Sequence, residues 1–298
     1  MAAEFLSESA KRAKDALSTV DAVPGVSKPD PILIAEGVRR NFGGVVAVDV
    51  DHLEVQRGSI TALIGPNGAG KTTLFNLLTG FDTPNEGNWM FDGRGLEKVV
   101  AHRAAAMGMV RTFQLTKSLT KMSVIENMKL GATHQVGEKW WNGLLPFRWK
   151  RQEEVIEKRA DELLKRFKLD HMRNEYAGTL SGGQRKLLEM SRALMTNPRL
   201  VMLDEPMAGV NPALTQSLLQ HIKDLREQGM TVLFVEHDMD MVRDISDWVI
   251  VMAQGKVIAE GPPDEVMRDE AVIVAYLGGH HDRALTDTGV SFTEEAGQ

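Results

Sequence analysis

Apolar residues along the chain follow two patterns, one typical of buried strands and the other of amphipathic helices. Short apolar runs predict strands buried on both faces, at residues 59–64, 200–203, 231–236 and 248–252. Runs with helical spacing predict helices, at residues 72–79, 124–131, 153–167 and 213–228. Strands and helices that alternate along the chain in this way indicate the α/β class.

A glycine-rich turn joins the first of these strands to the first helix. It reads Gly65-Pro66-Asn67-Gly68-Ala69-Gly70-Lys71-Thr72, with Thr73 next in the helix, and it matches the pattern G-x-x-x-x-G-K-[ST]. In this pattern backbone N–H groups surround phosphates, the lysine reaches the β- and γ-phosphates, and the Thr72 hydroxyl binds Mg²⁺. Phosphate would also lie at a helix N-terminus. The turn therefore predicts a site for ATP with Mg²⁺.

Two more runs follow at domain-scale spacing. The first is Leu180-Ser181-Gly182-Gly183-Gln184, and the second is the acidic pair Asp204 and Glu205 at the end of an apolar strand. Asp204 is placed to hold Mg²⁺, directly or through water. Glu205 follows immediately, where its carboxylate can polarise an attacking water. The two carboxylates predict that the bound nucleotide is hydrolysed.

The three runs, in this order, resemble those of ATP-binding cassette (ABC) proteins, over residues 32 to 279. The resemblance implies a P-loop NTPase fold with a RecA-like core, an antiparallel β subdomain and a helical subdomain at about residues 115–180. It also implies that two cassettes dimerise head to tail, so that the signature run of one subunit, here Ser181 to Gln184, closes on the ATP of the other. The glycines of this run expose backbone N–H groups, the serine adds a donor, and a helix N-terminus faces the γ-phosphate.

Three single residues lie where this family has functional side chains. Phe42 resembles the aromatic residue that stacks on adenine, and the alternative is a phenylalanine of the core. Gln114 resembles the glutamine that senses Mg²⁺ or water and leads into the helical subdomain, and the alternative is an ordinary polar loop residue. His237 resembles the histidine that contacts the γ-phosphate and aligns the catalytic water with Glu205, in preference to a structural histidine.

Length and composition agree with one two-lobed domain. The chain has 298 residues, of which 43% are hydrophobic, and it can bury a sizeable core over residues 31–279. Residues 1–30 read as an extension, either flexible or a short amphipathic helix. The helix is indicated by the apolar spacing of Phe5, Leu6, Ala10, Ala13, Leu17 and Val20. Residues 280–298 are polar and are expected to be disordered.

Composition also argues against several classes of protein. The absence of cysteine removes disulfides and fits a reducing cytosol. No apolar run approaches the roughly 18 residues that span a bilayer, so the chain is not expected to be a permease, and charge interrupts its first residues before a signal peptide could form. A net charge of −6 argues against nucleic acid as the main partner.

Within the ABC family, the chain looks most like the ATPase subunits of branched-chain amino acid importers. The runs that carry this likeness are 111–114, 205–212, 235–239, 254–255, 259–267 and 275–278. The likeness implies transmembrane permease subunits, a second ATPase subunit (identical or paralogous) and, indirectly, an extracytoplasmic substrate-binding protein, with the chain at the cytoplasmic face of a bacterial inner membrane. The ATPases of lipopolysaccharide export and urea import are similar enough to remain alternatives. Many branched-chain relatives have a degenerate signature, whereas residues 180–184 keep the general form.

Two other classes fit the sequence less well. A soluble ABC ATPase of DNA repair or translation usually carries a long coiled-coil insertion or two tandem cassettes, and this chain has neither. A regulatory module with an inactive site would lack catalytic side chains, whereas Lys71, Asp204, Glu205 and His237 are all present.

Residues 139–151 look inserted into the helical subdomain and combine aromatic with cationic side chains. The aromatic residues are Trp140, Trp141, Phe147 and Trp149. They either cover the subdomain's own apolar faces or contact a permease or the lipid headgroups beside it.

Overall fold

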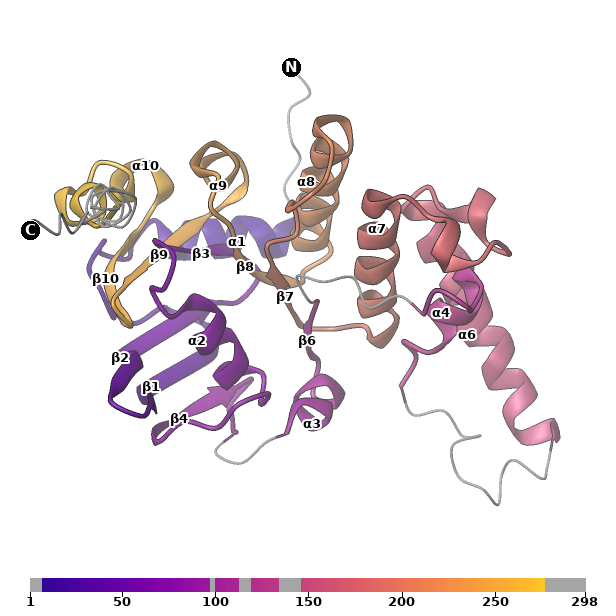
Figure 1. Ribbon diagram of the computed structural model, residues 1–298, viewed down its shortest axis with the longest axis horizontal. Helices are drawn as coiled ribbons and strands as arrows, with labels where there is room; N and C mark the ends of the chain where they lie inside the picture. The colour runs from indigo at the N-terminus through magenta and orange to yellow at the C-terminus, as the bar shows by residue number, and fades with distance from the viewer. Residues whose placement is uncertain (1–6, 97–99, 113–118, 134–145, 277–298) are drawn as a thin grey trace, which may run out of the picture.

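A six-stranded sheet lies at the centre of the computed structural model, which describes residues 7–96, 100–112, 119–133 and 146–276 (Figure 1). The strands from β9 to β6 run parallel, and β10 is antiparallel to β9. In the order β10-β9-β3-β8-β7-β6, their bounds are Lys256–Gly261, Trp248–Ala253, Ile60–Ile64, Thr231–Val235, Leu200–Asp204 and Met109–Arg111. Asp204 lies opposite Val235 at the end of the β7–β8 register. The residues that follow these two strands therefore emerge at the same edge of the sheet.

A second sheet is antiparallel and has the order β2-β1-β4-β5. Its strands are β1 (Pro31–Phe42), β2 (Val45–Gln56), β4 (Glu86–Phe91) and β5 (Arg94–Gly95). Helix α2 (Lys71–Leu78) contributes apolar side chains to the buried cluster that also contains side chains of both sheets: Leu74, Phe75, Leu77 and Leu78. The antiparallel sheet thus packs on the central sheet through α2, the helix that follows the glycine-rich turn.

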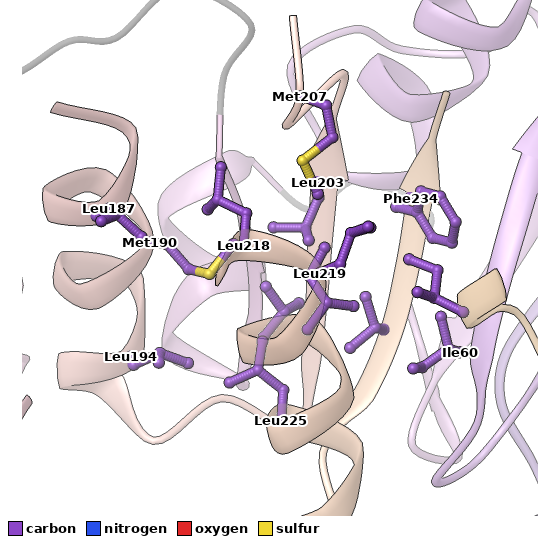
Figure 2. Close-up of a cluster of buried hydrophobic side chains, with 14 of the residues drawn as sticks. Ile60, Leu187, Met190, Leu194, Leu203, Met207, Leu218, Leu219, Leu225 and Phe234 are labelled. Atoms are coloured by element: carbon purple, nitrogen blue, oxygen red, sulfur yellow. The ribbon is translucent and has the colours of Figure 1, made fainter. Parts of the chain in front are cut away.

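The central sheet is buried on both faces, as its continuous apolar strands predict. Along β7, Leu200 and Met202 belong to the cluster shared with the antiparallel sheet. Val201 and Leu203 alternate with them and belong to the opposite cluster, together with helices α7 (Gly182–Ala193) and α8 (Pro212–Glu227) (Figure 2). Strand β7 therefore contributes side chains to both buried clusters, one on each face of the central sheet.

A helical layer lies beside α8 in Figure 1 and contains α4 (Val124–Lys129), α6 (Pro146–Arg166) and α7. These three helices pack against one another. The remaining helices are α3 (Ala101–Ala106), α9 (Met239–Ile245) and α10 (Pro263–Val266), with short 3-10 turns at Asp170–Met172, Ala177–Thr179 and Leu194–Thr196. The α/β class, with an antiparallel sheet and a separate helical layer, is confirmed.

The N-terminal segment contains helix α1 (Glu8–Leu17). Of the two expectations for residues 1–30, a flexible extension or a short amphipathic helix, the structure has the helix. Ala10, Ala13 and Leu17 form its buried face. The backbone N–H of Ser7 bonds the carboxylate of Glu227 at the end of α8. The helix is therefore docked on the body of the molecule.

A buried ion pair holds the chain between α1 and β1. The Nζ atom of Lys28 lies 2.5 Å from Oε2 of Glu260, and each side chain is 1% exposed. Glu260 also accepts hydrogen bonds from the Gly25 and Val26 N–H groups at 2.6 and 3.0 Å, and from Nε1 of Trp248 at 2.9 Å. Burial lowers the pKa of Lys28, and the Glu260 carboxylate opposes that shift.

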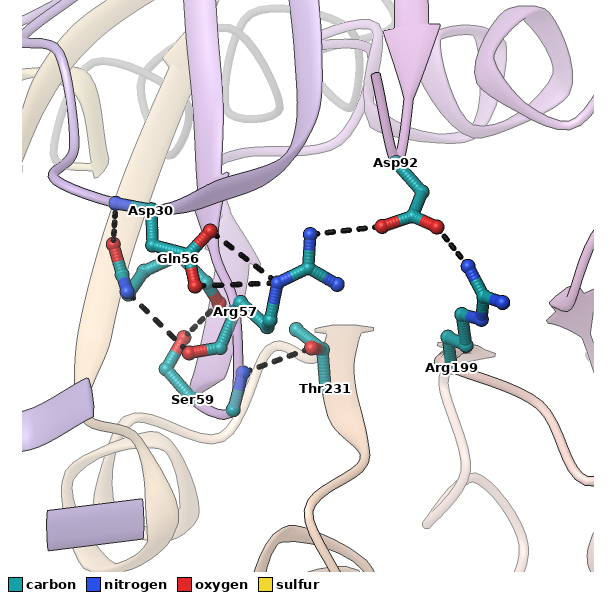
Figure 3. Close-up of polar contacts among 8 residues, drawn as sticks. Asp30, Gln56, Arg57, Ser59, Asp92, Arg199 and Thr231 are labelled. Carbon is teal, nitrogen blue, oxygen red and sulfur yellow. Dashed lines mark hydrogen bonds and ion pairs between the residues drawn. The ribbon is translucent and has the colours of Figure 1, made fainter. Parts of the chain in front are cut away.

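A polar network joins the N-terminal segment to both sheets (Figure 3). The Arg57 guanidinium bridges Asp30 at 3.2 Å and Asp92 at 2.9 Å. Arg199, just before β7, also pairs with Asp92. The network lies where the parallel strands begin, at the edge opposite the one that carries Asp204.

Several predicted boundaries differ from the structure. The helix expected at 153–167 begins at Pro146, because proline is well tolerated in the first turn of a helix. The helix expected at 124–131 ends at Lys129, and the strand expected at 59–64 begins at Ile60. Residues 146–151 of the apparent insert thus belong to α6. Trp140, Trp141 and residues 280–298 lie outside the described residues, as do the side chains of Phe147 and Trp149.

In the part of the chain that the structure describes, no helix is both long enough and apolar enough to span a bilayer.

Candidate nucleotide site

The glycine-rich turn leaves β3 at the carboxyl edge of the central sheet, and two of its glycines are required by close approach. A Cβ atom at Gly65 would lie 2.1 Å from the Met252 carbonyl oxygen, and one at Gly70 would lie 2.3 Å from that of Ala47. Gly65, Gly68 and Gly70 also have φ angles of +147°, +80° and +98°. Side chains at Gly65 or Gly70 would displace neighbouring backbone, so glycine is needed at both positions for the turn to take this shape.

The first turn of α2 begins directly after Gly70, which is its N-cap residue. Thr72 is exposed and Thr73 is half-buried, whereas Ala69 is buried. The Thr72 hydroxyl is therefore accessible at the N-terminus of the helix, where negative charge is favoured.

Lys71 points back over the turn. Its Nζ atom donates to the carbonyl oxygens of Gly65 at 2.7 Å and Pro66 at 3.0 Å. Burial lowers the pKa of Lys71, while the carboxylates of Glu205 and Asp204 oppose that shift. The structure thus places the ammonium group within electrostatic reach of both carboxylates.

Asp204 is buried at the end of β7 and is paired with Arg111. Nη2 of Arg111 donates to Oδ2 of Asp204 at 2.7 Å, and Nη1 donates to Oδ1 of Asn76 on α2 at 2.6 Å. The guanidinium therefore connects β6, β7 and the helix of the glycine-rich turn. This contact was not anticipated from the sequence.

Glu205 and His237 follow neighbouring strands and meet at the sheet edge. Nε2 of His237 lies 2.7 Å from Oε1 of Glu205, at hydrogen-bonding distance. The His237 side chain is 42% exposed and that of Glu205 is 20% exposed, so the pair borders solvent. Glu205 has a φ angle of +46°, a left-handed conformation that is unusual for a residue other than glycine.

Glu236 supports the turn after Glu205 from the β8 side. Its carboxylate accepts the Met207 N–H at 2.9 Å and the His237 N–H at 3.3 Å. Burial raises the pKa of Glu236, and these two backbone N–H groups oppose that shift. Glu236 is a second residue of the site that the sequence motifs did not single out.

The signature run begins α7 and is apart from the glycine-rich turn of the same chain. Ser181 and Gln184 form a reciprocal cap, in which Ser181 N–H donates to the Gln184 side chain at 2.9 Å and Gln184 N–H donates to Ser181 Oγ at 3.2 Å. A Cβ atom at Gly183 would lie 1.9 Å from a methyl group of Leu214, while one at Gly182 would meet open space. In Figure 1, α2 and α7 lie on either side of β6 and β7.

The structure describes Phe42 but not Gln114. The Phe42 ring is 51% exposed near the end of β1, and the guanidinium of Arg40 lies 4.6 Å from its centre. The core alternative for Phe42 is therefore wrong, and the ring is accessible for stacking. Gln114 lies outside the described residues.

Comparison with known proteins identifies the family to which the chain belongs. The family model described as "ABC transporter" matches residues 48–208, which is more than half of the chain. The chain belongs to the ABC transporter ATP-binding family. A second family model, "Branched-chain amino acid ATP-binding cassette transporter", matches residues 256–282 of this ABC ATPase.

Named relatives and solved structures agree with the family. The chain is 40% identical over 250 residues to the high-affinity branched-chain amino acid transport ATP-binding protein BraF of Pseudomonas aeruginosa, covering 83% of this chain and 98% of BraF. A structure of the ADP conformation of an ATP-binding cassette of an ABC transporter is 39% identical, with a TM-score of 0.72 over 83% of this chain and 99% of that one. A dimeric structure of a bacterial ABC transporter cassette is 25% identical, with a TM-score of 0.64 over 78% of this chain and 98% of that one. As a member of this family, the chain binds nucleotide and is an ATPase.

Proposed function

We propose that this ABC ATPase is the ATP-hydrolysing subunit of a membrane transporter that imports branched-chain amino acids. The single observation that carries the substrate class is the match of residues 256–282 to the branched-chain family model. In sequence, that segment follows the glycine-rich turn and the pair Asp204 and Glu205, which are proposed for nucleotide chemistry. BraF is named for branched-chain amino acid transport, and its similarity to 83% of this chain supports the same substrate class.

The residues at the sheet edge fit ATP and Mg²⁺. Residues 65–73 would hold the phosphates, because the glycine-rich turn leads into a helix N-terminus and Lys71 supplies a cation. The exposed ring of Phe42 would stack on adenine. Thr72 and Asp204 are oxygen donors of the type that Mg²⁺ prefers, and Gln114 is proposed as a further one. The bound ion would supply positive charge that stabilises charge developing on the phosphates.

Glu205 and His237 would carry out the hydrolytic step. Glu205 is placed as the base that accepts a proton from the attacking water, or that orients this water. His237 lies 2.7 Å from the Glu205 carboxylate and would keep it aligned, and its exposed ring would contact the γ-phosphate.

A second ATPase subunit would complete each site. Ser181 and Gly182 are exposed at the start of α7, which lies on the other side of β6 and β7 from α2 in Figure 1, so the signature run would be available to a partner. The dimeric bacterial cassette supports pairing of this kind. Whether the second subunit is a copy of this chain or a paralogue is decided by what copurifies with it.

The transport partners would be transmembrane permease subunits at the cytoplasmic face of a bacterial inner membrane. An extracytoplasmic binding protein would deliver the amino acid to them. The proposal assigns no nucleic-acid partner, since the net charge is −6. No residue of this chain is proposed to contact the cargo.

Purification of the tagged chain from detergent-solubilised membranes tests the proposal. The complex, reconstituted in liposomes with its binding protein, should show ATP hydrolysis that leucine, isoleucine or valine stimulates, together with ATP-dependent uptake. The Glu205→Gln complex is the matched control for hydrolysis. Stimulation by urea, or extraction of lipopolysaccharide without amino acid uptake, would assign the chain to another ABC system.

A further inference from the structure

Lys186 joins the signature helix to the turn that carries Glu205. It lies on α7, the helix that Ser181 caps, and its side chain is half-buried. Its Nζ atom donates to the carbonyl oxygen of Glu205 at 2.9 Å and to that of Pro206 at 3.1 Å. A single ammonium group therefore holds two successive carbonyls of the catalytic turn.

The same turn is also held by Glu236, through an amide group and not through carbonyls. The Glu236 carboxylate accepts the N–H of Met207, so the turn has a cation on its carbonyls and an anion on its amide. Burial lowers the pKa of Lys186, and Glu236 is the strongest of the carboxylates that oppose the shift. The two opposite charges attract each other. Each also bonds backbone groups of the turn that take no part in helix or sheet hydrogen bonds.

The turn has a conformation that requires such support. Glu205 has a φ angle of +46°, and a residue other than glycine keeps this conformation only when its surroundings hold it. Its N–H bonds the Val235 carbonyl at 3.1 Å, and its carbonyl also accepts the Ala208 N–H at 3.1 Å. The Met207 side chain is buried in the cluster that contains Leu187 of α7 (Figure 2). The two hydrogen bonds of Lys186 therefore tie the turn to α7.

We propose that Lys186 is a positioning residue for ATP hydrolysis, which fixes the backbone of Glu205 relative to the signature helix. Lys186 has no contact with the glycine-rich turn among the hydrogen bonds of the described residues. Its effect is therefore on the placement of the Glu205 carboxylate and of His237 beside it. The inference rests on the proposed role of Glu205 in hydrolysis.

The position of Lys186 also links the two sites of a dimer within one chain. The N-terminus of α7 would close on the nucleotide of the partner, while Lys186 on the same helix holds Glu205 at the chain's own nucleotide. A displacement of α7 on closure would change the support of Glu205 in the same chain. Hydrolysis at one site would thereby depend on engagement at the other.

Substitution of Lys186 separates positioning from nucleotide binding. In the full-length chain, Lys186→Met should lower kcat about ten-fold, since misplacement of a catalytic group mainly affects the chemical step. The affinity for ATP, measured by titration, should remain within about two-fold of wild type. Lys186→Arg should restore most of the kcat, and Lys186→Gln, with a neutral donor, should be intermediate. Lys223→Met is the matched control, because Lys223 is also half-buried but pairs with Asp244, at 3.3 Å.

Two further measurements distinguish positioning from general stability. Hydrogen exchange of the amides at residues 205–208 should be faster in Lys186→Met, while the strands β3 and β9 exchange as in wild type. In a Glu205→Gln background, Lys186→Met should cause little further loss of kcat, because the two changes affect the same group. If the Met variant folds poorly, the order of kcat values in the Arg and Gln variants gives the same test.

The outcomes separate this inference from the proposed function. Wild-type turnover in Glu205→Gln would remove Glu205 from hydrolysis, and the inference with it. An inactive Glu205→Gln together with wild-type kcat and exchange in Lys186→Met would overturn the inference alone. A fall in kcat that follows the melting temperature and is not rescued by arginine would show that Lys186 is structural.

Discussion

Arg111 and Asp204 form a buried ion pair at the edge of the nucleotide site. The Arg111 Nη2 to Asp204 Oδ2 distance is 2.7 Å, and the side chains are 4% and 5% exposed. Arg111 therefore holds one oxygen of the Asp204 carboxylate, the group that is proposed to face Mg²⁺. Because Arg111 also bonds Asn76 on α2, the same contact sets Asp204 relative to the glycine-rich turn.

The first prediction concerns this pair. Arg111→Met should lower the free energy of unfolding by about 3–5 kcal/mol, because it leaves the Asp204 carboxylate buried without its cation. Arg111→Met combined with Asp204→Asn should recover much of this loss, since no unpaired charge remains. Urea denaturation of the three variants measures both effects. A double variant no more stable than Arg111→Met would show that the charge of Asp204 is not the cause.

The second prediction concerns the N-terminal segment. Lys28→Met should destabilise the chain by about 3–5 kcal/mol, because the buried Glu260 carboxylate would keep its N–H partners but lose the Lys28 cation. Addition of Glu260→Gln should reverse most of the loss. Lys11→Met, at an exposed position of α1, is the control and should change stability by less than about 0.5 kcal/mol. Equal melting curves for Lys28→Met and Lys11→Met would contradict a structural role for the segment.

The sequence alone singles out the two carboxylates proposed for nucleotide chemistry, Asp204 and Glu205, and the glycine-rich turn proposed to hold phosphate. The turn of residues 65–72 is a local pattern, and its glycines are explained by contacts with Met252 and Ala47. Asp204 ends an apolar strand and His237 comes shortly after another, and parallel strands bring such residues to one edge of a sheet. Short-range patterns of this kind do not depend on the details of packing.

The supporting residues could not be found in the same way. Arg111 reaches Asp204, Lys28 reaches Glu260, and Lys186 reaches the Glu205 carbonyl only because the tertiary fold brings distant segments together. A lysine or arginine in the sequence is usually solvated, so burial of these cations gave no local signal. The early start of α6 was missed because Pro146 reads as a break in a helix as readily as a beginning.

The third prediction concerns sharing of sites between subunits. In a dimer with Lys71→Ala on one chain and Ser181→Arg on the other, both changes fall in the same composite site and one site remains intact. A dimer that carries both changes on one chain, with a wild-type partner, has a change in each site. The first dimer should retain trapped ATP at one site, and the second should retain none. Equal nucleotide retention by the two dimers would contradict a site shared between chains.

In the proposed mechanism, Glu205 drives hydrolysis of ATP held by residues 65–73. The most direct measurement is ATP binding and turnover of Glu205→Gln in the same preparation. The amide keeps the shape of the side chain and loses its charge and basicity, so ATP affinity should match wild type while turnover falls by at least about 100-fold. A closed dimer that retains ATP should accumulate. Turnover near the wild-type rate, with ATP binding intact, would show that Glu205 does not drive hydrolysis.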